Sequence, residues 1–434
     1  MSSTIIIILS LAIFFFWGFL SAIYKKFPFS IIRNIYWNFV SKDIPYDKDK
    51  KRIFYIIRDI YLTFINKDIP YDKDKKRVSY IKKFYNDKKL INYQEKIINE
   101  KLNNIKKNSN LIRKKIIDKY ILPDELINFN KLEMEKILSK KVHIDARQHQ
   151  FKNNPSADSI LLNIKYYNIN HYGILETNKK NKKLLIYHEG HDGNPYNSKN
   201  FLDFKEKFKT KGYDILSLSM TGLGYNMLLN PNYSFPINPE KNSDVSFNYQ
   251  FHNRELKCHD IYQFYFDKDY PNIMPLALML SGNYYIIKNL EDNYDEIVMM
   301  GISGGGGWHT TMFAALLPKI QKSYSFSGTF PKFFKLDKNT RTEWEDTYSK
   351  IYDEYDYWDF YFLALFDSEN FHNREHNLIF NSKDPYSYND PWATAFKNLV
   401  DLISIDNLRV IVLDKDRHEI NIEFVDEFIL KKLD

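Results

Sequence analysis

The segment Gly301-Ile302-Ser303-Gly304-Gly305 reads Gly-x-Ser-x-Gly. It lies between a short apolar run, residues 296–300, and an apolar segment of helical character, residues 308–317, which stops at Pro318. Glycines on both sides of a serine permit a strained turn from a strand into a helix, which exposes the serine hydroxyl. In this context the pattern predicts a nucleophile elbow with Ser303 as the attacking group. A glycine-rich turn around a buried serine is the alternative interpretation.

A serine nucleophile needs two partners, because its hydroxyl attacks a carbonyl only when a histidine takes the proton and a carboxylate orients that histidine. In elbow enzymes the acid and the histidine follow the serine in chain order. Asp384 follows the apolar run 377–380 and His418 follows the run 408–413. We therefore predict a triad of Ser303, Asp384 and His418. Alternatively, Asp384 caps a turn and His418 is a surface histidine in a charged loop. Other candidate acids are Asp356, Asp359 and Asp367.

Acyl transfer also needs hydrogen-bond donors at the developing oxyanion. The amide of Gly304, directly after the serine, is one predicted donor. The second predicted donor is the amide of His191, shortly after the apolar run 183–187. His188, His191 and Asp192 have a spacing that permits zinc, but no further ligand motif such as His-Glu-x-x-His accompanies them. We expect no metal and no cofactor.

The elements that must position these residues begin at about residue 142, where short apolar runs start to alternate with helical segments. This alternation is typical of a doubly wound α/β domain. Residues 160–167 and 173–177 are predicted to form an antiparallel pair. Six further runs resemble buried strands of a parallel sheet and bring the total to eight: residues 183–187, 214–218, 296–300, 323–327, 377–380 and 408–413. We expect the segments 225–279 and 344–366 to form a cap.

Together these features resemble the α/β-hydrolase superfamily over about residues 142–434. The resemblance rests on four places: His188-Glu189-Gly190-His191, Gly222-Leu223-Gly224, the run from Gly301 to Trp308, and Asp384 with His418. The glycine-rich elbow, with Ser327-Gly328-Thr329-Phe330-Pro331 after the next strand, is similar to a branch of serine esterases and related acyl hydrolases. The resemblance implies a triad, a two-amide oxyanion hole and no cofactor.

The chain departs from that family in two places. Its first loop reads His-Glu-Gly, with Glu189 inserted where many members have His-Gly. The elbow run has an additional glycine, Gly307, before Trp308.

A stretch without charged residues, 5–24, precedes Lys25 and Lys26. As a helix it is long enough to span a hydrocarbon layer of roughly 30 Å. A cleavable signal peptide is the alternative, but no Lys or Arg precedes Ile5 and no Ala-x-Ala site is present. We predict an uncleaved membrane anchor within residues 1–24. The positive charges that follow it place the catalytic domain in the cytoplasm.

A basic helical stem is predicted over residues 25–141. Residues 1–183 carry 37 Lys and Arg against 18 Asp and Glu, whereas the remainder carries 25 against 37. The stem contains a tandem repeat of 25 residues, 32–56 and 57–81. We interpret it as a recent duplication in a segment that tolerates added residues. The helical pattern of residues 88–121 has two interpretations: a helix packed on the core or on a second copy, or an amphipathic helix on anionic lipid.

Composition limits the remaining function classes. Hydrophobic residues make up 44% of the chain and can supply a large core, and the single cysteine, Cys258, allows no intramolecular disulfide. No nucleic-acid-binding signature accompanies the basic residues. We hypothesise a membrane-anchored serine hydrolase of carboxylic esters, with apolar acyl or lipid esters as substrates. The alternatives are a serine peptidase of the same fold and a catalytically silent, membrane-tethered interaction protein.

Overall fold

The computed structural model describes the part of the chain that carries the predicted catalytic domain and one helix before it. The described ranges are residues 88–121, 134–138, 159–166, 169–178, 180–191, 194–221, 275–331, 349–352, 354–366, 374–386, 388–405 and 407–433. The predicted anchor, both copies of the repeat and most of the segment 225–279 lie outside these ranges. None of the helices within them has the length and apolarity needed to cross a bilayer.

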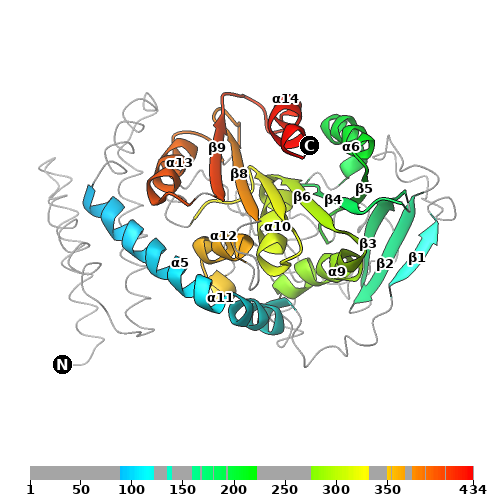
Figure 1. The fold of residues 1–434 in the computed structure, drawn as a ribbon, viewed down its shortest axis with the longest axis horizontal. Coiled ribbons are helices and arrows are strands. Elements are labelled where there is room, and N and C mark those ends of the chain that lie inside the picture. The colour runs from blue at the N-terminus through cyan, green and yellow to red at the C-terminus, as the bar shows by residue number, and fades with distance from the viewer. Residues whose placement is uncertain are drawn as a thin grey trace, which may run out of the picture. The chain divides into compact units, whose positions relative to one another are not determined.

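A sheet of nine strands forms the centre of the described chain, in the order β1-β2-β3-β5-β4-β6-β7-β8-β9 (Figure 1). The strands are β1 (Glu135–Leu138), β2 (Ile160–Tyr166), β3 (Ile169–Glu176), β4 (Lys183–His188), β5 (Tyr213–Leu218), β6 (Glu296–Ile302), β7 (Lys322–Phe326), β8 (Glu375–Asn381) and β9 (Leu408–Leu413). Strand β3 is antiparallel to both its neighbours, β2 and β5. From β5 across to β9 the neighbouring strands are parallel.

The eight predicted strands are confirmed as β2 to β9, and β1 is an additional edge strand. It pairs antiparallel with β2 and lies before residue 142. Its four residues, Glu-Lys-Ile-Leu, alternate too little and are too few to stand out as a strand in the sequence.

Helices cover both faces of the sheet because alternate strand residues point to opposite sides. In β4, Leu184 and Ile186 join one apolar cluster, whereas Leu185 and Tyr187 join the other. The first cluster contains α9 (Pro275–Leu290), α10 (Ser303–Leu316), α12 (Tyr357–Leu365) and α13 (Trp392–Ile403). The second contains α6 (Lys199–Thr210) and the C-terminal segments α14 (Ile422–Phe424), η8 (Val425–Ile429) and η9 (Leu430–Lys432) (Figure 1). Burial on both faces explains the mainly apolar sequences of the central strands β4 and β6.

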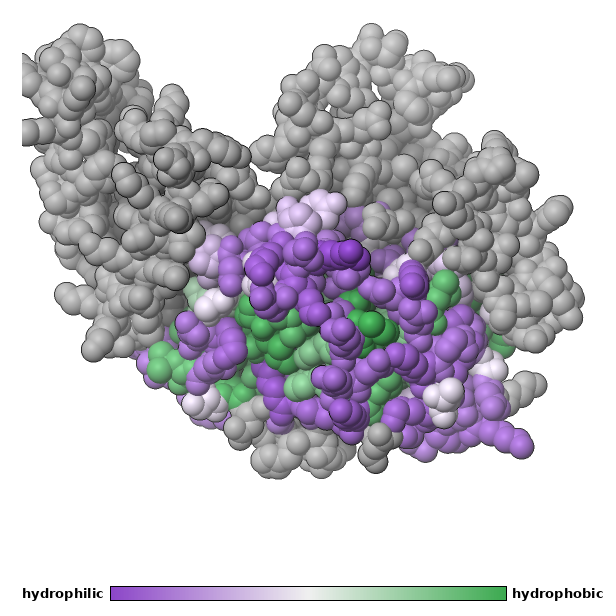
Figure 2. Space-filling model, turned by 90° about the horizontal axis from the view of Figure 1, so that it is seen from above, coloured by the Kyte–Doolittle hydropathy of each residue, from purple (hydrophilic) through white to green (hydrophobic). Residues whose placement is uncertain are grey.

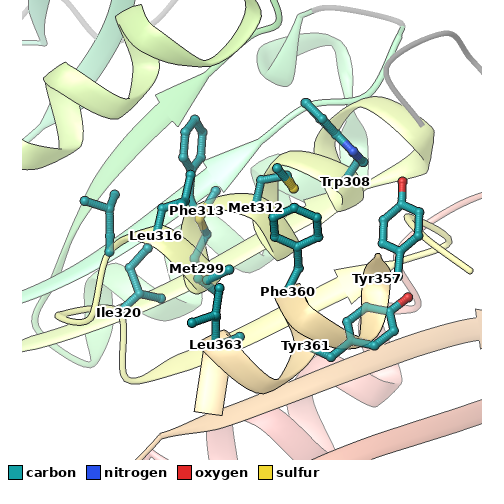
Figure 3. Close-up of a cluster of buried hydrophobic side chains, with 14 of the residues drawn as sticks. Met299, Trp308, Met312, Phe313, Leu316, Ile320, Tyr357, Phe360, Tyr361 and Leu363 are labelled. Carbon is teal, nitrogen blue, oxygen red and sulfur yellow. The ribbon is translucent and has the colours of Figure 1, made fainter. Parts of the chain in front are cut away.

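Part of the predicted cap is core instead. Every residue of α12 is buried. Figure 3 shows Phe360 of α12 directed toward Met312 of α10, with Tyr357 near Trp308. A helix that is apolar on all sides belongs inside a protein, so the expectation of a cap across 344–366 was wrong for α12. The short helix α11 (Ser349–Tyr352) precedes it, and its residues Ile351 and Tyr352 belong to the same core.

Helix α5 (Lys88–Ile116) packs on this core through its apolar face. The face contains Ile98, Leu102, Ile105, Ile112 and Ile116, all buried in the cluster that includes α12. The helix changes direction at Asn108, whose φ of −128° and ψ of 15° are not helical, and continues as η1 (Ile117–Ile121). Of the two interpretations of this segment, the structure agrees with packing on the core. Most described lysines of the helix are exposed, whereas Lys101 is partly buried and pairs with Asp359 of α12.

Two buried arginines bind the C-terminal carbonyl groups of α10 and α12. Arg113 of α5 donates to the carbonyl oxygens of Ala315 at 2.8 Å and Leu363 at 2.6 Å. Arg374 donates to Leu363 O at 2.9 Å and, on the α10 side, to Ala314 O. The last carbonyls of a helix lack intrahelical donors and carry partial negative charge. The guanidinium groups therefore satisfy both helix ends and connect α5 to them.

On the face that Figure 2 shows, the described surface is mostly polar. Figure 2 shows hydrophilic residues over most of it, with hydrophobic residues visible between them near the centre. Among the described residues, the exposed large hydrophobic side chains are Leu111, Tyr386 and Leu402. Of these, Tyr386 lies beside a predicted catalytic residue.

Candidate active site

Ser303 occupies a strained turn between β6 and α10. It is the first residue of α10, directly after Ile302 at the end of β6. Ile302 is extended, with φ −123° and ψ 151°, whereas Ser303 has φ 70°. A positive φ is unusual for a residue with a Cβ and marks local strain. The chain therefore passes from strand to helix at Ser303, as the nucleophile-elbow pattern predicts.

Glycines let the elbow approach the end of β4 closely. A Cβ on Gly306 would lie 2.1 Å from the carbonyl oxygen of His188. A Cβ on Gly190 would lie 2.7 Å from Ser303 Cβ and 3.4 Å from its Oγ. Such distances exclude a side chain at either glycine. The loop after β4, which contains the predicted donor His191, therefore passes directly beside the Ser303 hydroxyl.

Asp384 and His418 form a hydrogen-bonded pair after β8 and β9. His418 Nδ1 lies 2.7 Å from Asp384 Oδ2, and the two side chains are 17% and 0% exposed. A carboxylate oxygen accepts this hydrogen bond, so Nδ1 is the donor, and in the neutral form of the ring Nε2 keeps its lone pair. The tautomer that a general base requires follows from this arrangement.

Neighbouring groups orient the Asp384 carboxylate. Ser327 Oγ donates to Oδ2 at 3.0 Å, and the Tyr386 amide donates to Oδ1 at 2.8 Å. The ring of Tyr386 packs edge-on against the His418 imidazole, with centroids 4.9 Å apart. Sequence reasoning missed both supporting residues. The sequence shows Ser327 directly after a predicted strand, but it does not show that this serine contacts Asp384.

The loop that carries His418 is fixed from β8. Asn381 Nδ2 donates to the carbonyl oxygens of Arg417 at 2.7 Å and Glu419 at 3.1 Å. These carbonyls flank His418 on both sides. The last residue of β8 thus holds the histidine loop near the acid that follows the same strand.

All three predicted triad residues lie at the carboxyl edge of the parallel strands, where ligands bind in open α/β sheets. No hydrogen bond between Ser303 and His418 occurs in the described part of the chain, although both residues are described. Catalytic hydrogen bonds are often long without substrate. The backbone of the elbow helix nevertheless approaches the backbone beside the acid closely: a Cβ on Gly307 of α10 would lie 2.6 Å from Gly328 Cα. Gly328 follows Ser327, which bonds Asp384.

The predicted oxyanion donors lie in two adjacent backbone segments. The Gly304 amide belongs to the first turn of α10, where N–H groups lack intrahelical acceptors and carry partial positive charge. In the other segment, the Gly190 amide donates to the Glu189 carboxylate at 2.9 Å. His191, the predicted second donor, is the next residue and is partly exposed.

Two buried histidines lie beneath this loop. The rings of His188 and His309 stack with centroids 4.0 Å apart. Burial lowers the pKa of His309 to about 4 and that of His188 well below its usual range. Both are therefore neutral at pH 7, and neither acts as a cation. No group of His, Cys, Asp and Glu side chains within the described ranges has the arrangement of a metal site.

The alternative acids of the sequence have other partners. Asp356 and Asp359 form a capping box at the start of α12. Asp359 also lies 2.6 Å from Lys101 Nζ, in an ion pair with α5. Asp367 lies outside the described residues.

Comparisons with known proteins concern the fold alone. No protein-family model matches the chain, and no curated protein matches it. Among solved structures, acetyl xylan esterase 1 from Thermoanaerobacterium sp. JW/SL YS485 is 14% identical, with 75% of this chain and 93% of that chain covered and a TM-score of 0.41. The esterase Pf2001 of Pyrococcus furiosus is 13% identical, covering 65% and 93%, with a TM-score of 0.38. Est1E from Butyrivibrio proteoclasticus is 12% identical, covering 63% and 97%, with a TM-score of 0.36.

Because these identities and TM-scores are low, the fold is assigned from the chain's own topology. The features that decide it are the antiparallel β3 within an otherwise parallel order from β2 to β9, the elbow between β6 and α10, and the acid and histidine after β8 and β9. With these features, the described chain has the α/β-hydrolase fold.

Proposed function

We propose that the chain is a serine hydrolase that cleaves carboxylic esters through an acyl-enzyme. The observation that carries the proposal is the strained Ser303, with the β4 loop against it and the Asp384–His418 pair at the same sheet edge. Strain at a single residue is retained where the surrounding structure over-determines it, and such residues cluster at active sites. The resemblance of the elbow sequence to serine esterases favours ester substrates.

The mechanism assigns one step to each group. His418 Nε2 accepts the proton of the Ser303 hydroxyl while Oγ attacks the ester carbonyl carbon. The amides of Gly304 and His191 donate to the oxyanion of the tetrahedral intermediate. His418 then protonates the departing alcohol, and an acyl-enzyme remains on Ser303. Water, deprotonated by His418, attacks this acyl group and releases the acid, while Asp384 remains ionised throughout.

Hydrolysis of p-nitrophenyl esters from acetate to laurate tests the proposal, with a peptide p-nitroanilide measured in parallel. We expect ester turnover by the full-length wild type and loss of about 10³-fold or more in Ser303→Ala and Asp384→Asn, the magnitudes typical of triad residues. Cleavage of the anilide with little ester turnover would assign a peptidase. Equal ester turnover by Ser303→Ala would refute the serine mechanism.

We further propose that residues 5–24 anchor the enzyme in a membrane, with the catalytic domain on the cytoplasmic side. This proposal is supported by the length of the segment, which carries no charged residue, and by the lysines that follow it. The full chain is expected to remain with membranes after an alkaline carbonate wash, whereas a variant without residues 1–24 is released. Release of both proteins by the wash would contradict an anchor in this segment.

A further inference from the structure

We propose that Glu189 is a positioning residue that fixes the oxyanion loop, a role that rests on the proposed hydrolase function. Glu189 is the residue by which the first loop departs from the His-Gly pattern of many α/β hydrolases. Its carboxylate and its main chain hold the peptide group that precedes the predicted donor. The inferred consequence is that turnover depends on the hydrogen bonds of this side chain.

Hydrogen bonds from both its side chain and its main chain hold Glu189 in place. Its side chain accepts from the Gly190 amide through Oε1 and from the Tyr187 hydroxyl through Oε2, both at 2.9 Å. Its main-chain N–H donates to Leu218 O at 3.1 Å. Its carbonyl oxygen lies 2.8 Å from His188 Nδ1. With 6% exposure the residue is buried, and hydrogen bonds inside a protein hold geometry more firmly than those in water.

The direction of the His188 bond follows from its other nitrogen. Asn283 Nδ2 lies 3.1 Å from His188 Nε2, and an amide nitrogen is a donor, so Nε2 accepts. The neutral ring therefore carries its proton on Nδ1 and donates it to the Glu189 carbonyl. Asn283 Nδ2 also donates to Ser219 O at 3.0 Å, which connects α9 to the end of β5. The loop is thus supported from beneath by two secondary-structure elements.

This support lies directly beside the reacting serine. A Cβ on Gly190 would be 3.4 Å from Ser303 Oγ, and one on Gly305 would be 3.3 Å from Gly190 Cα. Because the Gly190 amide is bound by Glu189, the peptide plane between the two residues has a fixed orientation. His191 is the next amide along the chain. Preorganised donors stabilise an oxyanion only if their direction is set before the reaction.

A negative charge at this position would oppose the proposed reaction, because it would repel the nearby oxyanion. The useful property of Glu189 is then its pair of acceptor oxygens. Glutamine keeps one acceptor for the Gly190 amide and offers an amide nitrogen to the Tyr187 hydroxyl, which accepts as well as donates. Glutamine at position 189 should therefore preserve turnover, whereas alanine should lower it.

Three variants and a control test this role in the full-length enzyme. Glu189→Ala should lower kcat by about 10- to 100-fold and leave KM within about threefold, because the lost hydrogen bonds matter most in the transition state. Glu189→Gln should restore kcat to within about threefold of the wild type. Tyr187→Phe keeps the stacking on Phe201, with centroids 4.4 Å apart, and should lower kcat about two- to fivefold. Tyr213→Phe is the matched control, since its hydroxyl bonds Glu296 at the opposite end of the sheet and its loss should leave kcat unchanged.

The outcomes separate this inference from the proposed function. Wild-type turnover combined with unchanged kcat in Glu189→Ala, or with Glu189→Gln as slow as Glu189→Ala, overturns the positioning role alone. Absence of wild-type turnover and of labelling at Ser303 removes the proposed function and this inference together. If Glu189→Ala does not fold, as judged by thermal denaturation, Tyr187→Phe and Glu189→Gln decide: unchanged kcat in Tyr187→Phe, or a loss of tenfold or more in Glu189→Gln, overturns the role.

Discussion

The two ends of helix α10 are built in opposite ways. At its N-terminus, glycines bring backbone against backbone, and Ser303 adopts a φ of 70°. At its C-terminus, the carbonyl oxygens of Ala314 and Ala315 are bound by the buried side chains of Arg374 and Arg113. One end therefore presents N–H groups and a strained hydroxyl at the sheet edge, whereas the other end is closed by arginines.

Under the proposed function, the difference separates the end of the helix that takes part in the reaction from the end that stabilises the fold. The N-terminal turn of α10 lacks a side-chain cap. Its N–H groups are therefore available to the proposed oxyanion hole, which requires donors that are not already bound. The other end of α10 is stabilised instead. There the guanidinium groups bind the carbonyl oxygens, and apolar residues of α12 pack against α10 (Figure 3). We therefore expect substitutions at the two ends to affect different measurements.

The largest effect is expected at the glycine end. Gly306→Ala places a Cβ 2.1 Å from the His188 carbonyl, a rigid backbone atom, so the elbow or β4 must move. We expect kcat to fall by about 100-fold or more, since a displacement of about 1 Å has such effects, together with a loss of roughly 1–3 kcal/mol in the free energy of unfolding. Steady-state kinetics and urea denaturation measure the two quantities.

Leu316→Ala provides the control for that experiment at the other end of α10. Its side chain is 1% exposed, and its truncation should cost about 2–5 kcal/mol of unfolding free energy. The kcat of the folded fraction should stay within about threefold of the wild type. A Gly306→Ala enzyme that is destabilised but retains its kcat would remove the distinction between the two ends.

At the arginine end, the expected effect is on stability alone. Arg113→Ala leaves carbonyl oxygens of α10 and α12 without this donor, for an expected loss of roughly 2–4 kcal/mol in unfolding free energy and little change in kcat. Arg113→Lys should not restore stability, because an ammonium group lacks the planar fork that reaches several carbonyls. Urea denaturation of both variants measures this. Full recovery by lysine would show that charge alone, rather than the fork, matters at this position.

Acid should destabilise the protein through its buried histidines. Burial lowers the pKa of His309 and His171 to about 4 and that of His376 to about 3. Since the unfolded chain takes up these protons near pH 6.5, unfolding free energy is lost as pH falls from about 6.5 toward 4, by about 2 kcal/mol per histidine at pH 5.

Comparison of urea denaturation at pH 7 and pH 5 measures this loss, with His376→Gln as the informative variant. His376 lies between Ser323 and Thr311, away from the elbow, and glutamine can still bond to both hydroxyls. The variant should lose less stability than the wild type between the two pH values. An equal loss in both proteins would show that His376 does not contribute.

The smallest effect concerns Tyr386. Its ring is 54% exposed and touches the His418 imidazole edge-on. Tyr386→Ala should lower kcat about three- to tenfold, because an aromatic contact of about 1 kcal/mol no longer helps to orient the base. Tyr386→Phe keeps the ring and should match the wild type. Equal rates for the alanine and wild-type enzymes would exclude this orienting role.

Sequence patterns predicted eight of the nine described strands and the places after them where Ser303, Asp384 and His418 lie. Both rest on local signals: apolar runs mark strands, and the chain order of an elbow enzyme assigns residues to strand ends. The catalytic roles of these residues stay predictions. The packing of α12 was missed because an aromatic helix in the core and an aromatic cap have the same composition. The contacts of Arg113 and Ser327 join residues distant in sequence, which no local pattern encodes.

A fluorophosphonate probe on the detergent-solubilised full chain shows whether Ser303 is an activated nucleophile. Mass spectrometry of the digested protein identifies the modified residue. We predict a single stoichiometric adduct on Ser303 in the wild type, no adduct in Ser303→Ala, and labelling slowed by about 10³-fold or more in His418→Ala. Folded wild-type protein that reacts at another residue, or does not react at all, would contradict the account.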